Sequence, residues 1–365
     1  MEGKDVILKN YTWDYLNNYN HGKKLCFFGT GRLLERFLRS HENPQIDLFI
    51  DNSNEKQGKY YVVNEKEIPI ISVEEFSKKN VTMYIMVIAV LNVAEIYSQI
   101  EKFETMKDME CCILVFLMDM ENNELENKRF YPSDYRILTK PVIPKRIHYC
   151  WFGKSAIPEK NRIWMESWKK YCPDYEIIEW NEDNYDINKN KFMRQAYEAK
   201  KWGFVPDYAR LDIIYCNGGI YLDTDVELLK PLDDLLYQEA FCGIDESKCV
   251  SLGLGFGARK NNGMIGELRE LYDNIKFDVN KMVAAPAMQK QYFANKGYKT
   301  NGDYQIIGDM TIYPEKVLSG KSNITGIIRP TEHTYAVHHY DASWVDEKRL
   351  YNISKRQELY WELNN

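Results

Sequence analysis

The chain has 365 residues, of which 44% are hydrophobic and 28% are charged, and its formal net charge is −6. This balance is typical of folded globular proteins, and the length predicts two domains, or three. The acidic balance argues against a broad basic face for nucleic acid, but it leaves room for a local pocket that binds a phosphorylated small molecule.

The first part of the chain alternates between strand and helix patterns. Strands are expected at 24–28, 46–50, 84–90 and 112–117, and helices near 33–38 and 94–103. Such alternation predicts a parallel sheet with helices on its faces. We therefore expect a Rossmann-like domain over residues 1–130.

Two glycines and an aspartate in this domain resemble part of a dinucleotide-binding fingerprint. Gly29 and Gly31 follow the first strand and Asp51 ends the second, but Leu34 stands where the third glycine belongs. An incomplete pattern of this kind is weak evidence for a ligand. We favour a scaffold or interaction surface, with Asp51 capping a strand end, and keep ligand binding as the alternative.

The chain becomes polar between Asp119 and Lys140, and part of this stretch suits a helix. We place a linker at 131–142 and a second domain at 143–365, which opens with a strand near 142–149. This linker is the predicted boundary between the two domains.

The chain has eight cysteines but no C-x-x-C pair, and several lie in apolar runs such as Cys111-Cys112-Ile113. We expect reduced, buried thiols. The N-terminus lacks an apolar signal segment, and the apolar runs are shorter than the roughly 20 residues that span a bilayer. The expectation is a cytoplasmic protein, bound at most peripherally to the inner face of the membrane.

Asp223 and Asp225 lie where a predicted strand runs out into a turn. Alternate residues of an extended chain project to the same side, so Tyr221 shares a face with both, while Ile220, Leu222 and Val226 can point into the core. Neighbouring carboxylates repel each other unless a cation or donors compensate. A hard divalent ion, Mg²⁺ or Mn²⁺, meets this need and can also bridge a diphosphate. The bare D-x-D tripeptide is weak, because it occurs by chance in many proteins.

A helix is predicted just upstream, over 203–215, with Pro206 in its first turn. Asp207 and Arg210 are three positions apart, so a carboxylate and a guanidinium project together from it. The alternative is an ion pair on a solvated helix face. Because Asn217-Gly218-Gly219 turns the helix directly into the acidic strand, we favour one site built by both.

These stretches resemble the sugar-binding region containing the DXD motif of glycosyltransferase family 32. The resemblance is carried by Phe204 to Leu236, with further matches at Ile143 to Gly153, Ser167-Trp168, Pro173 to Glu176 and Val337 to Trp344. The family includes bacterial capsular and cell-wall polysaccharide enzymes and fungal mannosyltransferases, and it is similar to the large bacterial glucosylating toxins. The N-terminal part looks like the generic Rossmann-type extension of some bacterial members.

The resemblance implies a GT-A fold, a mixed sheet flanked by helices. It also implies a metal-dependent, retaining glycosyltransferase in bacterial polysaccharide biosynthesis. The implied donor is a nucleotide sugar, with UDP favoured, and the implied acceptor is a glycan or a lipid-linked oligosaccharide. The departing diphosphate would accept the acceptor's proton. The alternative is another sugar-nucleotide-processing enzyme, either a pyrophosphorylase or a Rossmann oxidoreductase.

Site residues follow from the same resemblance. The residues that it implies for catalysis are Asp207, Arg210, Asp223 and Asp225. The residues that it implies for donor binding are Trp151, Asp207, Arg210, Tyr221, Asp223 and Trp344. Trp151 would stack on the base and Trp344 would close over the diphosphate, and for both the alternative is a core aromatic.

The resemblance further implies that a late histidine completes the metal sphere with Asp223 and Asp225. We favour His339 over His338, and only one can face the metal, because adjacent strand residues point to opposite sides. A separate glycine-rich run, 253–257, has no Gly-Lys-Ser/Thr after it. We interpret it as a loop of close approach beside the donor sugar.

Overall fold

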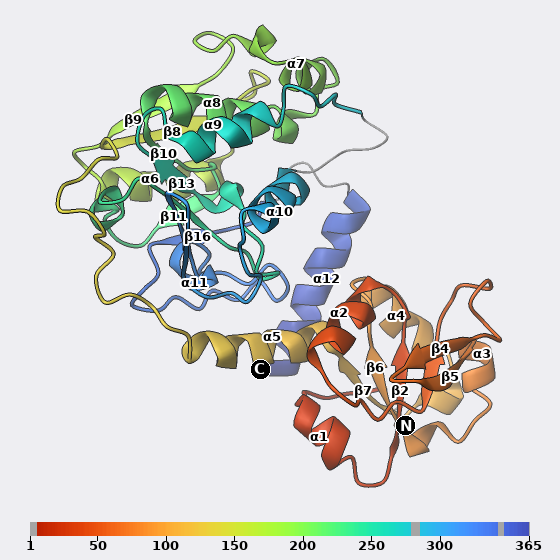
Figure 1. The fold of residues 1–365 in the computed structure, drawn as a ribbon. Coiled ribbons are helices and arrows are strands. Elements are labelled where there is room, and N and C mark those ends of the chain that lie inside the picture. The colour runs from red at the N-terminus through yellow and green to blue at the C-terminus, as the bar shows by residue number, and fades with distance from the viewer. Residues whose placement is uncertain (1–5, 279–284, 342–346, 365) are drawn as a thin grey trace. The chain divides into compact units, whose positions relative to one another are not determined.

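The computed structural model describes residues 6–278, 285–341 and 347–364 (Figure 1). The chain forms two compact units. The first unit comprises residues 1–127, 324–326 and 345–365, and the second comprises 128–323 and 327–344. Among the described helices, none has the length and apolar character needed to cross a bilayer.

The first unit is built on a seven-stranded sheet in which every neighbouring pair except β5–β4 is parallel. In spatial order the strands are β1 (Ile7–Leu8), β7 (Glu110–Ile113), β6 (Tyr84–Ile88), β2 (Lys24–Phe28), β3 (Leu48–Ile50), β5 (Lys66–Ile71) and β4 (Tyr60–Val63). The predicted parallel sheet is thus confirmed.

The first unit has six helices among its described residues. They are α1 (Trp13–Asn18), α2 (Arg32–Ser40), α3 (Val73–Phe76), α4 (Val93–Ile100), α5 (Leu114–Asn127) and α12 (Glu347–Asn364), with 3₁₀ turns η1 (Val81–Met83) and η2 (Glu104–Met106). Leu34 and Phe37 of α2 share a core with Leu25 and Phe27 of β2. The apolar face that the sequence predicted for α2 therefore packs on the sheet.

One predicted strand, 112–117, is wrong in its second half. The strand ends at Ile113, and Leu114 to Leu117 form the buried first turn of α5. A short apolar run buried on all sides has no periodicity that separates strand from helix. The change from strand to helix within this run was therefore invisible in the sequence.

In the first unit, the loop that contains Gly29 and Gly31 is hydrogen-bonded to Asp51. Asp51 Oδ2 accepts hydrogen bonds from the Thr30 backbone N–H at 3.0 Å and from the Thr30 hydroxyl at 2.6 Å. Lys56 Nζ also donates to this oxygen, at 3.0 Å. The Asp51 carboxylate, directly after β3, thus holds the loop that follows β2, at the carboxyl ends of these two strands.

The compact units differ from the predicted ranges 1–130, 131–142 and 143–365 at residues 128–130, at the predicted linker, at residues 324–326 and at helix α12. Helix α12 belongs to the first unit, where Tyr360 packs edge-on against Phe116 at 4.9 Å. The predicted linker belongs to the second unit, where the Val142 N–H donates to the Leu236 carbonyl at 2.9 Å.

The second unit has a mixed seven-stranded sheet, as the family resemblance implied. In spatial order its strands are β14 (Gln305–Ile307), β15 (Met310–Tyr313), β12 (Ala240–Gly243), β13 (Phe256–Ala258), β10 (Gly219–Tyr221), β8 (Arg146–Cys150) and β9 (Glu176–Trp180). The three pairs β12–β15, β10–β8 and β8–β9 are parallel, and the others are antiparallel. A separate antiparallel ribbon joins β11 (Val226–Leu228) to β16 (Ala336–His338).

Helices cover both faces of this sheet (Figure 1). They are α6 (Glu159–Tyr171), α7 (Lys191–Glu198), α8 (Pro206–Asn217), α9 (Gly263–Glu270), α10 (Ala285–Asn295) and α11 (Glu315–Leu318), with 3₁₀ turns η3 (Ile187–Lys189), η4 (Trp202–Phe204), η5 (Asp233–Leu236) and η6 (Leu252–Leu254). One core includes Tyr221 together with α7, α8 and α9, and the other includes Ile220 together with α6 and β11. Adjacent residues of β10 thus face opposite layers.

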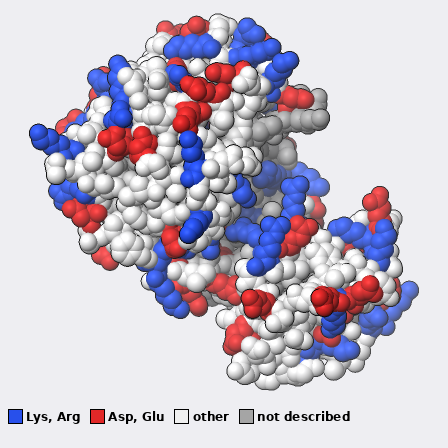
Figure 2. All heavy atoms as spheres, in the orientation of Figure 1, with Lys and Arg blue, Asp and Glu red and all other residues white. Residues whose placement is uncertain are grey.

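Lys and Arg side chains are interspersed with Asp and Glu over the visible face of each unit (Figure 2). All eight cysteines are free; seven are buried, as predicted, and Cys216 is exposed.

Candidate functional site

The acidic pair lies in a tight turn between β10 and β11. β10 ends at Tyr221, β11 begins at Val226, and the Val226 N–H closes the turn on the Asp223 carbonyl at 3.1 Å. Leu222 and Val226 are buried on either side. The structure therefore has the predicted strand that runs out into a turn, anchored by apolar residues.

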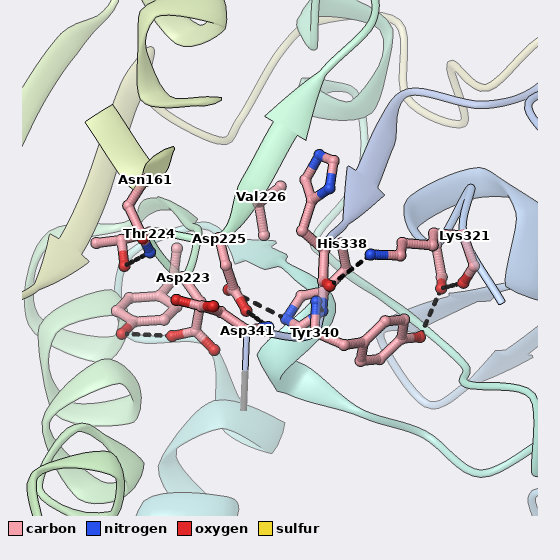
Figure 3. Close-up of polar contacts among 12 residues, drawn as sticks. Asn161, Asp223, Thr224, Asp225, Val226, Lys321, His338, Tyr340 and Asp341 are labelled. Atoms are coloured by element: carbon pink, nitrogen blue, oxygen red, sulfur yellow. Dashed lines mark hydrogen bonds and ion pairs between the residues drawn. The ribbon is translucent and has the colours of Figure 1, made fainter. Parts of the chain in front are cut away.

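Three side chains converge at this turn (Figure 3). Asp223, Asp225 and His338 each offer one ligand atom, and these atoms all lie within 4.8 Å of one another. His338 reaches the turn because β16 pairs with β11 in a register that sets it opposite Val226. Its Nε2 lies 3.4 Å from Asp225 Oδ1, while Asp225 Oδ2 accepts the Asp341 N–H at 2.9 Å.

This donor set fits a divalent cation. The two carboxylates suit a hard divalent ion such as Mn²⁺ or Mg²⁺, and an imidazole is a common additional ligand of first-row transition metals. Burial raises the pKa of Asp223, Arg210 opposes that rise, and the Asp225 carboxylate adds to it. A cation between the two carboxylates would relieve the repulsion that this pKa reflects.

The structure corrects the predicted choice between the two histidines. His339 points away from the cluster: its Nε2 lies 2.9 Å from Glu227 Oε2, and its ring stacks on Trp164 with centroids 4.1 Å apart. His338 faces the acidic turn instead. The two do point to opposite sides, as strand geometry requires, but the sequence did not show which side faces the aspartates.

Asp207 and Arg210 form a buried network rather than a solvated ion pair. Both side chains are 9% exposed, and Arg210 Nη2 lies 3.2 Å from Asp207 Oδ1. Arg210 Nη1 lies 3.3 Å from Asp223 Oδ2, so the network continues from α8 into the acidic turn. Burial raises the pKa of Asp207 to about 7, with Arg210 lowering it and Asp223 raising it.

Tyr221 completes this network. Its hydroxyl donates to Asp223 Oδ1 at 3.0 Å, and the Arg210 guanidinium lies 5.0 Å from the centre of its ring. The structure therefore brings Asp207, Arg210, Tyr221 and Asp223 together as the sequence predicted. Their roles toward a donor are still predictions.

The glycine-rich run reaches the same place. A Cβ added at Gly253 would lie 3.3 Å from Asp223 Oδ2 and 3.5 Å from Arg210 Nη1. Gly253 lies in η6, where the Leu252 N–H donates to Gln289 Oε1 at 3.1 Å. The loop thus approaches the Asp223 carboxylate and the Arg210 guanidinium closely.

Of the two tryptophans predicted to bind the donor, Trp151 lies in the described part of the chain. Trp151 directly follows β8, and its indole N–H donates to the Ser155 carbonyl at 2.7 Å. β8 and β10 are parallel neighbours, so Trp151 and Tyr221 both lie where the carboxyl ends of these strands meet. Trp344 lies outside the described residues.

Sequence reasoning missed several charged and polar neighbours of the turn. Asn161 Nδ2 donates to Thr224 Oγ1 at 3.1 Å, and Lys160 pairs with Asp341. Lys321 Nζ donates to the His339 carbonyl at 3.0 Å, and burial lowers the pKa of Lys321 although Asp225 and Asp341 oppose this. No local pattern marks these residues, because they reach the turn from distant parts of the chain.

Comparison with known proteins finds a family model that matches the part of the chain around this site. Residues 158–242 match the model of the glycosyltransferase sugar-binding region containing the DXD motif. This segment contains α6, α8 and the acidic turn. The match agrees with the resemblance stated from the sequence.

Curated relatives match over short segments. Subversion of eukaryotic traffic protein A of Legionella pneumophila is 30% identical over 122 residues, which cover 26% of this chain and 19% of that protein. Inositol phosphoceramide mannosyltransferase 3 of Schizosaccharomyces pombe is 28% identical over 137 residues, which cover 35% and 37%. The chain thus spans less than half of the length of these relatives. Among solved structures, the PaToxG glycosyltransferase is similar with 19% identity and a TM-score of 0.36, over 50% of this chain and 75% of that one.

Proposed function

We propose that the second unit is a metal-dependent glycosyltransferase that moves a sugar from a nucleotide-sugar donor to an acceptor. One observation carries this proposal: Asp223, Asp225 and His338 converge directly beside the buried pair of Asp207 and Arg210. The convergence lies largely within the segment that matches the family model. A cation site beside a buried carboxylate–guanidinium pair suits a diphosphate-linked sugar.

The metal ligands and Arg210 would have different roles in such a transfer. A divalent ion held by Asp223, Asp225 and His338 would supply Lewis-acid stabilisation of the leaving diphosphate. Arg210 is fixed by two carboxylates and lies over the ring of Tyr221, so its remaining N–H donors are oriented before a ligand arrives. Such preorganised donors stabilise charge that develops in the transition state.

Asp207 is suited to bind a sugar hydroxyl. Its carboxyl group is buried and lies 3.2 Å from the Arg210 guanidinium, which holds it in one orientation. A carboxylate held in this way can accept a hydrogen bond from a sugar hydroxyl. The position of Asp207 on α8 keeps it adjacent to Arg210, so both groups would contact the same sugar.

We further propose a retaining mechanism, a UDP-sugar donor and a cytoplasmic protein that works at the membrane surface on a glycan or lipid-linked acceptor. The names of the fission yeast relatives support a lipid-linked acceptor and a mannose donor, so mannose donors belong in any donor screen. The bacterial polysaccharide context rests on the family resemblance.

A donor screen by thermal stabilisation tests the proposal. UDP- and GDP-sugars are added singly to the full chain, with and without Mn²⁺, and the melting temperature is measured. We expect at least one nucleotide sugar to raise it with Mn²⁺ present, and Asp225→Asn to abolish that rise. Asp183→Asn, at an exposed position of the same unit, is the matched control and should respond as the wild type does. A screen in which no nucleotide sugar stabilises the wild type would contradict the proposal.

A further inference from the structure

Helix α6 binds alternate residues from the acidic turn into β11. Asn161 Nδ2 donates to Thr224 Oγ1 at 3.1 Å, and Trp168 Nε1 donates to the Val226 carbonyl at 2.8 Å. The Leu228 N–H donates to Ser167 Oγ at 2.8 Å. Since β16 pairs with the other edge of β11, side chains of α6 occupy the edge that no strand of the described residues covers.

The first of these bonds differs from the other two in where it acts. Thr224 lies between the two aspartates, so the Asn161 bond holds the middle of the turn (Figure 3). The other two bonds hold the strand that follows the turn. Within the turn, the backbone bond from Val226 to the Asp223 carbonyl is a separate restraint. The Asn161 bond is therefore a restraint on the turn that comes from another element, helix α6.

The burial of this pair indicates that the bond is specific. Asn161 is 3% exposed and Thr224 is 8% exposed. Among the described residues, Asn161 Oδ1 has no hydrogen-bond partner, so half of the amide gains nothing from its burial. Burying such a group costs stability, and a leucine of similar volume would avoid that cost. The Thr224 bond is the contact that the asparagine makes and a leucine cannot.

We propose that Asn161 is a positioning residue of the cation site. Through Thr224 it fixes the separation and direction of the Asp223 and Asp225 carboxylates, and so sets the affinity of the turn for a divalent cation. This inference rests on the metal site of the proposed function. Groups that orient metal ligands without touching the ion typically change metal affinity by about tenfold to a hundredfold.

The test is a double-mutant cycle on the binding of Mn²⁺ alone, measured by titration calorimetry on the full chain. Asn161→Leu and Thr224→Val each remove the bond from one side and nearly preserve volume. We expect each to raise the Kd for Mn²⁺ by about tenfold, and the double variant to be no weaker than the weaker single variant. Two routes to the same bond keep the test valid if one variant folds poorly.

Ser167→Ala is the matched control, because it removes a bond from the same helix to Leu228, beyond the turn. It should lower the melting temperature of the metal-free protein and leave the Kd unchanged. The inference is overturned if both single variants bind Mn²⁺ as the wild type does, or if their effects on the Kd simply add. If Asp225→Asn also binds Mn²⁺ normally, the metal site of the proposed function fails as well, and that result separates the two failures.

Discussion

Arg210 Nη1 lies 3.3 Å from Asp223 Oδ2, and this contact joins helix α8 to the acidic turn. The same guanidinium contacts Asp207 at 3.2 Å, so one side chain links a candidate sugar-binding carboxylate to a candidate metal ligand. A residue in this position should affect turnover more than its charge alone explains.

Arg210→Lys is the variant that separates geometry from charge. Lysine keeps the positive charge between the two carboxylates but loses the planar fork that contacts both. We expect donor turnover to fall by roughly a hundredfold, the order of one lost oriented donor in a transition state. The measurement is the initial rate of donor hydrolysis, with the melting temperature recorded in parallel. Normal turnover in a folded variant would assign Arg210 a structural role.

The two histidines give a paired prediction. His338→Ala removes a candidate ligand and should weaken Mn²⁺ binding by at least about tenfold. His339→Ala instead removes the stacking on Trp164 and the contact with Glu227, so it should lower the melting temperature and leave the Kd for Mn²⁺ close to that of the wild type. Calorimetric titration of both variants measures the difference. The reverse pattern would restore the assignment that the sequence favoured.

Gly253→Ala tests the close approach of η6. The added methyl group would lie 3.3 Å from Asp223 Oδ2, tight enough to displace the carboxylate slightly. We expect a folded protein whose KM for the donor rises by roughly fivefold to tenfold, about 1 kcal/mol. Gly263→Ala is the control, because nothing lies within 4 Å of its added carbon. Equal KM values for the two variants would show that the close approach of Gly253 does not affect donor binding.

The first unit gives a prediction on pH. Burial lowers the pKa of His41, but the hydrogen bonds to Glu121 and to the Phe37 carbonyl raise it more, so the net shift is upward. A histidine with a raised folded-state pKa contributes stability that is complete below its unfolded pKa, about 6.5, and is lost as the pH rises through the folded value. The melting temperature of the first unit should therefore fall above pH ~6.5.

Glu121→Gln removes the charged partner 3.1 Å from His41 Nε2 and should flatten this dependence. Scanning calorimetry of the wild type and the variant between about pH 5.5 and 8 measures it. Parallel curves for the two proteins would show that the ion pair does not contribute to the pH dependence.

The acidic turn shows how far the sequence could lead. Alternation placed Tyr221 and Asp223 on one face, and the structure joins them by a hydrogen bond of 3.0 Å. Helical spacing likewise placed Asp207 beside Arg210. Both arguments concern residues within one element or one turn, where chain geometry alone determines which side chains meet.

The contacts that the sequence did not reveal depend on how distant elements pair. His338 rather than His339 faces Asp225 because of the register between β16 and β11, and a shift of one residue would reverse the choice. Asn161 reaches Thr224 only because α6 packs along β11. Likewise, the run 112–117 crosses from strand to helix at Ile113, a boundary that tertiary burial sets.

The most direct test of the central claim is donor hydrolysis by the full chain with a nucleotide sugar that stabilises it, measured in Mn²⁺, in excess chelator, and for Asp225→Asn in Mn²⁺. A metal-dependent transferase predicts hydrolysis by the wild type in Mn²⁺ and loss of most of that rate in the other two conditions, with the variant folded. Hydrolysis that persists in chelator or in Asp225→Asn would contradict it.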